Sequence, residues 1–76
     1  IDVRGFRANE AVDAVAYFVD EALQLGVSSV RILHGTGTGA LRESIRTYLS
    51  GVRGVQHFRD EDVRFGGAGI TVVEME

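Results

Sequence analysis

Two amphipathic helical stretches, each set between short strand-like segments, constrain the fold of this chain most strongly. The first repeats apolar residues at steps of three and four from about residue 8 to 25, and Gly26 follows it. The second has the same period from about residue 38 to 51. The two apolar stripes are Ala11, Val15, Phe18, Ala22 and Leu25, then Leu41, Ile45, Tyr48, Leu49 and Val52. The pattern predicts two helices that each bury these residues in a core.

Four strand-like segments surround these helices: residues 1–4, 29–33, 55–59 and 70–75. Strand–helix–strand units make right-handed crossovers, so the first three strands are predicted to be parallel, with both helices on one face. The short connection before the last strand favours an antiparallel partner. The predicted fold is therefore an α/β two-layer sandwich of order βαβαββ, with a four-stranded mixed sheet. The acidic and glycine-rich segment 60–69 is predicted to be a mobile loop.

Length and composition define the class of chain. The 76 residues suffice for one small domain, and without cysteine there is no disulfide, thiolate nucleophile or sulfur-based zinc site. No run approaches the roughly 18 consecutive apolar residues of a membrane span, and no signal peptide is visible. We expect a cytoplasmic domain. Because the chain begins directly in a strand-like pattern, we also expect it to be excised from a longer protein.

The charge is unevenly distributed. The chain carries −3 overall, but residues 31–59 hold five basic residues against one acid, a net +4. These residues are Arg31, Arg42, Arg46, Arg53 and Arg59, with Glu43 as the acid. The spacing of Arg42, Arg46 and Arg53 predicts a shared helix face, provided the helix continues that far. Such a patch indicates either phosphate binding or an ordinary solvated helix face.

The stretch HGTGTG, residues 34–39, follows the second predicted strand and precedes the second helix. Its glycines allow a ligand to approach the backbone closely, and the helix behind them offers unpaired N–H groups. Loops that leave parallel strands meet at one sheet edge, so Asp2 and Arg4 are predicted to lie near His34. The stretch therefore predicts an anion site.

Two nucleotide-binding motifs compete for this stretch. Residues 35–40 match the dinucleotide fingerprint G-x-G-x-x-A, with Asp60 about 20 residues further on. The chain is nevertheless too short for a doubly wound domain, and its glycines follow the second strand instead of the first. A phosphate-binding loop of the Walker type needs a lysine, and this chain has none. Dinucleotide binding is therefore disfavoured and the Walker reading is excluded.

Three motifs in order resemble the Smr (small MutS-related) domain along the whole chain. IDVRG is similar to the family's L-D-x-[HR]-G, HGTGTG to its H-G-x-G-x-G, and GGAGITVV to its closing G-G-x-G-x-T-x-V. Arg4, where stand-alone members more often have histidine, resembles the version at the C-terminus of bacterial MutS-like proteins of the second type. The resemblance implies a fold akin to the C-terminal domain of translation initiation factor 3, within a larger and dimeric MutS-like ATPase.

The resemblance also implies an activity. Family members nick or cleave DNA, and several cleave RNA on stalled or collided ribosomes, so DNA, RNA and the ribosome are the expected partners. Carried over by motif, Asp2, Arg4 and His34 are the expected catalytic residues, with His34 as proton acceptor or donor and Asp2 either orienting it or binding a divalent metal. The expected nucleic-acid-binding residues are Gly35, Thr36, Gly37, Thr38, Gly39, Arg42, Arg46 and Arg53.

Each of these assignments has a plainer alternative. His34 could simply hydrogen-bond the loop, and Asp2 could pair with Arg4. His57 is expected to be a surface or packed strand residue, and Phe65 to cover the sheet's rim or stack on a base. For the whole domain, the alternative to an endonuclease is a non-catalytic module that binds nucleic acid or the ribosome for the parent ATPase.

Overall fold

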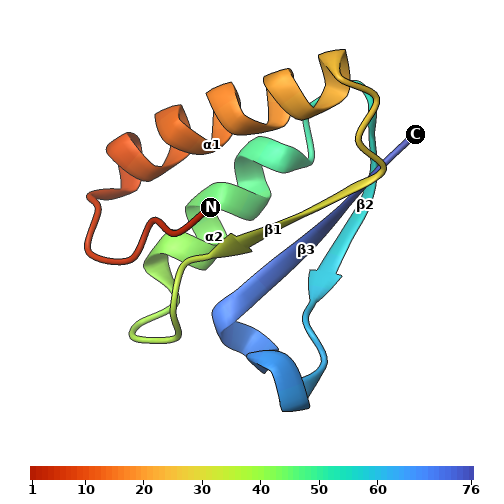
Figure 1. The fold of residues 1–76 in the computed structure, drawn as a ribbon. Helices are drawn as coiled ribbons and strands as arrows, with labels where there is room; N and C mark the ends of the chain where they lie inside the picture. The colour runs from red at the N-terminus through yellow and green to blue at the C-terminus, as the bar shows by residue number, and fades with distance from the viewer.

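The computed structural model describes all residues, 1–76, as two helices on one face of a small sheet (Figure 1). The helices and strands are α1 (Ala8–Gln24), β1 (Ser29–Leu33), α2 (Ala40–Leu49), β2 (Val55–Asp60) and β3 (Ile70–Met75). Two 3-10 turns, η1 (Val63–Phe65) and η2 (Gly67–Gly69), connect β2 to β3. The predicted order of helices and of the last three strands is confirmed. Neither helix is long and apolar enough to cross a bilayer.

The predicted four-stranded mixed sheet is wrong, because the sheet has three strands in the order β1-β3-β2. β3 is antiparallel to both neighbours, so β1 and β2 share a direction but never pair. The predicted first strand makes only one parallel bridge, Asp2 to Leu33. It is too short to do more, since the chain turns at Gly5, where φ is +82°. The likeness to translation initiation factor 3 stays a prediction.

The helices end where the sequence predicts, within one or two residues. α1 stops in a Schellman motif: the Gly26 N–H donates to the Leu23 carbonyl (3.2 Å) and the Val27 N–H to that of Ala22 (2.9 Å). Gly26 has a φ of +73°, which only glycine adopts at little cost. α2 is shorter than predicted and stops at Leu49.

The core lies between the helices and the sheet. Its fully or nearly fully buried residues are Val3, Ala11, Val15, Val19, Ala22, Ile32, Ile45, Leu49, Val73 and Met75. Val3 of the N-terminal segment and Ile32 of β1 are fully buried in this core. Phe18 and Tyr48 are only half-buried, and Leu25 is 72% exposed, so the predicted stripes extend too far at their edges.

The predicted mobile loop 60–69 instead forms the two 3-10 turns. The Phe65 and Gly67 N–H groups both donate to the Asp62 carbonyl, at 2.8 and 3.0 Å. Gly67 and Gly69 are buried. Figure 1 shows these turns at the same end of the sheet as the loop between β1 and α2, which carries the HGTGTG stretch.

Candidate functional site

The loop between β1 and α2, residues 35–39, surrounds a cavity of about 290 Å³ at the N-terminus of α2. Arg4 from the N-terminal segment and Arg42 from α2 contribute the two cationic side chains of its lining. The other lining residues are His34, the glycine loop itself, Ala40 and Leu41. The predicted meeting of Arg4 with the HGTGTG stretch is therefore confirmed.

The glycine loop leaves several backbone N–H groups without a protein partner. Gly35, Gly37 and Gly39 all have positive φ, between +40° and +81°, which turns the backbone sharply around the cavity. Some N–H groups are used internally: that of Gly39 donates to the Thr36 carbonyl and that of Ala40 to Thr38 Oγ1. The unpartnered N–H groups belong to Thr36, Gly37, Thr38, Leu41 and Arg42. Unpaired N–H groups at a helix N-terminus form an anion-binding arrangement.

Both carboxylate oxygens of Asp2 accept hydrogen bonds from Arg4. Its Oδ1 accepts from the Arg4 backbone N–H and from Nε, both at 3.0 Å, and its Oδ2 accepts from Nη2 at 2.8 Å. The side-chain hydrogen bonds from Arg4 lower the pKa of Asp2 to about 2, so this carboxylate is ionised at neutral pH. No hydrogen bond joins Asp2 to His34, so the predicted orienting role of Asp2 toward His34 is wrong. The plainer alternative, an Asp2–Arg4 pair, is confirmed.

His34 is buried, and protein groups occupy both of its ring nitrogens. Nδ1 lies 2.8 Å from the Gly35 carbonyl and Nε2 lies 2.8 Å from Thr71 Oγ1. Because a carbonyl only accepts, Nδ1 carries the proton and donates to Gly35. Nε2 then accepts from the Thr71 hydroxyl. His34 therefore fixes the first peptide of the glycine loop, as the plainer alternative predicts.

Arg46 sets the direction of the Thr71 hydroxyl. Its Nε and Nη2 both lie 3.1 Å from Thr71 Oγ1, and a guanidinium can only donate. The Thr71 proton is thereby free to point at His34. Nη2 of Arg46 also donates to Asp60 Oδ1 (2.6 Å), which accepts from Arg42 Nη2 as well (2.9 Å). One chain of hydrogen bonds thus runs from Asp60 through Arg46 and Thr71 to His34.

This environment keeps His34 neutral. Burial lowers the pKa of His34 below its usual value, and the positive charges of Arg46 and Arg42 add to the effect, against the bond to Gly35 and the charge of Asp60. A neutral imidazole can accept a proton, but here Nε2 is blocked by Thr71. Proton transfer at His34 therefore requires the Thr71–His34 hydrogen bond to open.

The residues present do not make a metal site. No group of three or more His, Asp or Glu side chains converges anywhere in the chain. Asp2, the carboxylate predicted as a possible metal ligand, has both oxygens bonded to Arg4. The donor set at the cavity consists instead of N–H groups and guanidinium groups, which attract anions.

The predicted face shared by Arg42, Arg46 and Arg53 is wrong. α2 ends at Leu49, so Arg53 lies in the following turn, more than the length of the ten-residue helix, or about 15 Å, from the glycine loop. Arg46 points inward to Thr71, and its Cζ lies 5.6 Å from the centroid of the Phe58 ring. Of these three arginines, Arg42 alone lines the cavity. His57 is an exposed strand residue near Glu74, as expected.

Thr71 and Asp60 are the site residues that the sequence did not assign to this site. A signal for Thr71 was present: it is a polar residue in the apolar strand ITVV, and it falls on the threonine of the third motif. Its side chain is fully buried. Asp60 carried no comparable signal, because its pairing with two arginines of α2 depends on how β2 lies against that helix.

Fold and site together define a small α/β domain in which a glycine loop with unpartnered N–H groups joins a strand to a helix. Over residues 1–76 the sequence matches the family model of the Smr domain, and the chain belongs to this family. It is 43% identical over its whole length to the protein named Endonuclease MutS2 of Bacillus cytotoxicus, of which it covers 10%. The chain thus spans about a tenth of the length of the curated relatives it matches.

Two solved structures are similar to the chain. The Smr domain of Thermus thermophilus MutS2 superposes with a TM-score of 0.96 at 43% identity, covering all of this chain and 95% of that one. YdaL, a stand-alone small MutS-related protein from Escherichia coli, superposes with a TM-score of 0.93 at 23% identity, covering all of this chain and 63% of that one. The second likeness shows the shared fold alone.

Proposed function

We propose that this chain is a nucleic-acid-binding domain that cleaves phosphodiester bonds with little sequence specificity. The observation that carries the proposal is the cavity of about 290 Å³ whose lining combines unpartnered N–H groups with Arg4 and Arg42. A phosphate group matches this set of donors, because guanidinium groups and loop amides bind its oxygens without reading a base. The name of the bacterial relatives, endonuclease, supports cleavage as the outcome of binding.

In this proposal the glycine loop and the arginines stabilise the charge that builds on the non-bridging oxygens during attack by water. Arg4 is positioned for this by Asp2, which acts through its ion pair and not as a proton carrier. His34 accepts a proton only after a bound phosphate draws Arg46 from Thr71 and the Thr71–His34 hydrogen bond opens, which frees Nε2. DNA and RNA both present the phosphate, and ribosomal RNA and a dimeric MutS-like parent ATPase in the cytoplasm belong to the same proposal.

A non-catalytic binding module is the second candidate. It is favoured by the two occupied nitrogens of His34 and by the Asp2–Arg4 pair, which together leave no free general base at the cavity. In this version the glycine loop binds the nucleic-acid backbone, and the cleavage reaction is not catalysed by this domain.

The two candidates separate in one experiment. The 76-residue chain is incubated with supercoiled plasmid and with an end-labelled single-stranded RNA, with and without chelator, and binding is followed in parallel by fluorescence anisotropy. His34→Gln is compared with His57→Gln, which changes the other, exposed histidine. We expect His34→Gln to lose cleavage while it still binds, and His57→Gln to retain both.

Binding without cleavage by the unchanged chain, on both substrates and in every metal condition, would leave only the binding module. Absence of binding to either nucleic acid at low salt would contradict both candidates. Circular dichroism of His34→Gln separates a lost fold from a lost reaction, since His34 is buried.

A further inference from the structure

The η1 turn, Val63–Phe65, exposes apolar side chains that the fold does not use. Val63 is 87% exposed and Phe65 is 63% exposed, and no other part of the chain covers them. Between them lies Arg64, whose Cζ is 5.4 Å from the centroid of the Phe65 ring. An aromatic ring beside a guanidinium is the pair of groups on which nucleobases stack in proteins that bind single strands.

The turn holds this pair in place. Asp62 accepts three hydrogen bonds from Arg64: from its backbone N–H at 2.9 Å, from Nε at 3.0 Å and from Nη2 at 2.8 Å. The Asp62 carbonyl also accepts the N–H of Phe65 at 2.8 Å. Since the turn is fixed before any ligand arrives, little conformational entropy is lost on binding.

The turn is also joined to the glycine loop. The Gly69 carbonyl accepts from both the His34 and the Gly35 N–H groups, at 3.1 and 3.0 Å. A Cβ atom at Gly69 would lie 3.7 Å from Gly35 and from Thr36 Cγ2, so the two segments pack directly. Phe65 and Gly69 are four residues apart, so their Cα atoms lie within about 14 Å of each other.

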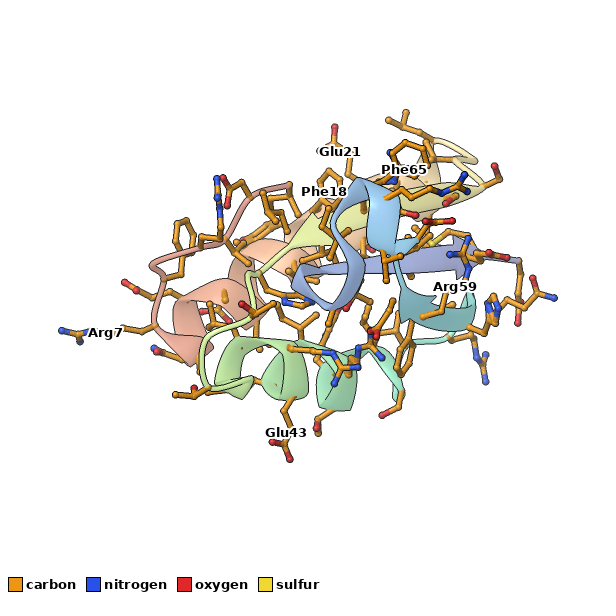
Figure 2. All side chains as sticks on the ribbon, turned by 90° about the horizontal axis from the view of Figure 1, so that it is seen from below. Arg7, Phe18, Glu21, Glu43, Arg59 and Phe65 are labelled. Atoms are coloured by element: carbon orange, nitrogen blue, oxygen red, sulfur yellow. The ribbon has the colours of Figure 1, made fainter.

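Phe65 projects to the side of the molecule opposite Glu43 on α2 (Figure 2). The glycine loop, which borders the cavity, and the η1 and η2 turns, which carry Phe65, both lie at the end of the sheet where β1 ends and β3 begins (Figure 1). A strand that enters at α2 and places a phosphate in the cavity would continue across this end toward Phe65.

The acidic residues near the turn do not oppose such a strand. Asp60 pairs with Arg42 and Arg46, and Asp62 pairs with Arg64. Glu61 forms an ion pair with Arg31 at 2.6 Å, although its angle is not that of a hydrogen bond. Each carboxylate is thus matched by an arginine, and the exposed tip carries the uncharged side chains of Val63 and Phe65 beside Arg64.

We propose that Phe65, supported by Arg64, is a stacking platform for an unpaired nucleobase of the strand whose phosphate lies in the glycine-loop cavity. The proposal rests on the proposed function, since it presumes that nucleic acid binds there. It also specifies the class of substrate. We expect single strands, and sites where a base is unpaired, to bind this chain more tightly than continuous duplex does.

A tryptophan probe tests this directly, because the chain contains no tryptophan. Phe65→Trp is titrated with oligothymidylate and with a blunt hairpin duplex, and Tyr17→Trp, at an 82% exposed position on α1, serves as the control. We expect oligothymidylate to quench the fluorescence of Phe65→Trp and not that of Tyr17→Trp. By anisotropy, Phe65→Ala should weaken single-strand binding about tenfold, leave duplex binding within about twofold, and leave the salt dependence unchanged.

Two outcomes overturn the proposal without touching the proposed function: Phe65→Ala binds single strands like the unchanged chain, or Phe65→Trp saturates by anisotropy with constant fluorescence. If the unchanged chain binds no oligonucleotide at all, the proposed function and this proposal fail together. Because Phe65 is mostly exposed, both variants should keep the circular dichroism of the unchanged chain.

Discussion

The chain has two glycine-rich segments at one end of its sheet, and their structural roles differ. Residues 35–39 turn around a cavity and leave the backbone N–H groups of Thr36, Gly37 and Thr38 without partners. Residues 66–69 lie behind them, with Gly67 and Gly69 buried, and use the Gly69 carbonyl to hold His34 and Gly35. The first segment is open to a ligand and the second supports it.

Glycine content therefore does not by itself indicate a binding loop. What separates the segments is where their backbone polar groups go. In the supporting segment the N–H groups of Gly67 and Gly69 are paired within the turn. In the open segment the N–H groups of Thr36, Gly37 and Thr38 have no partner, and those of Leu41 and Arg42 are left free in the first turn of α2.

The largest expected effect separates the two segments by stability. Gly66 has a φ of +131°, and a Cβ there would lie 2.4 Å from Ile70 Cδ1, whereas Gly37 has a φ of +40° with nothing within 4 Å. We expect Gly66→Ala to lower the free energy of unfolding by about 3 kcal/mol and Gly37→Ala by about 1 kcal/mol. Urea denaturation of both variants measures this. Equal losses would show that the supporting segment is no more constrained than the open one.

Thr71→Val tests the link between the segments and the core. The substitution leaves His34 Nε2 and Arg46 without a buried partner, so we expect a loss of about 2 kcal/mol in unfolding free energy. Thr71→Ser, which keeps the hydroxyl, should recover most of it. Nitrogen NMR of the unchanged chain should show His34 protonated at Nδ1 only. Protonation at Nε2 would contradict the hydrogen-bond directions given above.

Arg42→Ala tests the open segment. Removing one phosphate contact should weaken nucleic-acid binding and reduce the slope of log K against log salt by about 1. Arg53→Ala is the matched control, because Arg53 is exposed but lies beyond the far end of α2. Anisotropy titrations at several salt concentrations measure both slopes. An equal change in the two variants would indicate a diffuse basic surface instead of a site.

The smallest effect concerns pH. The pKa of His34 is lowered in the fold, mainly by burial, from its usual 6.5. On acidification the unfolded chain therefore binds a proton at His34 before the folded chain does, so stability is full above about pH 6.5 and falls below it. Melting temperatures between pH 7.5 and 5 should show this decline in the unchanged chain and in His57→Gln, and less of it in His34→Gln. A flat profile in the unchanged chain would contradict the buried, neutral histidine.

The sequence predicted the helices and the last three strands because their apolar residues recur at a clear period, and Gly26 and Gly51 mark where the two helices end. It did not predict the sheet order, since the insertion of β3 between β1 and β2 is a long-range choice that leaves no local pattern. The same limit applies to the site. His34 and the loop glycines are contiguous and were found, but Asp60 and Thr71 meet Arg46 only through tertiary packing.

The length of α2 explains why the predicted face shared by Arg42, Arg46 and Arg53 is wrong. Arg53 continues the helical spacing of Arg42 and Arg46, yet Gly51 and Gly54 end the helical periodicity near Leu49. Spacing predicts a shared face only while the helix lasts. The prediction for Arg46 is wrong for a different reason. Its side chain turns inward to Thr71, and helical spacing alone does not show whether an arginine faces the solvent or the core.

Phosphate binding by the glycine loop is tested most directly by an amide NMR titration. The labelled chain is titrated with inorganic phosphate and then with a short single-stranded oligonucleotide. We expect the amides of Thr36, Gly37, Thr38, Leu41 and Arg42 to shift with both ligands, while those of Gly67 and Gly69 shift little with phosphate. Shifts confined to the sheet face away from the helices, or no shifts at the loop with saturating oligonucleotide, would contradict it.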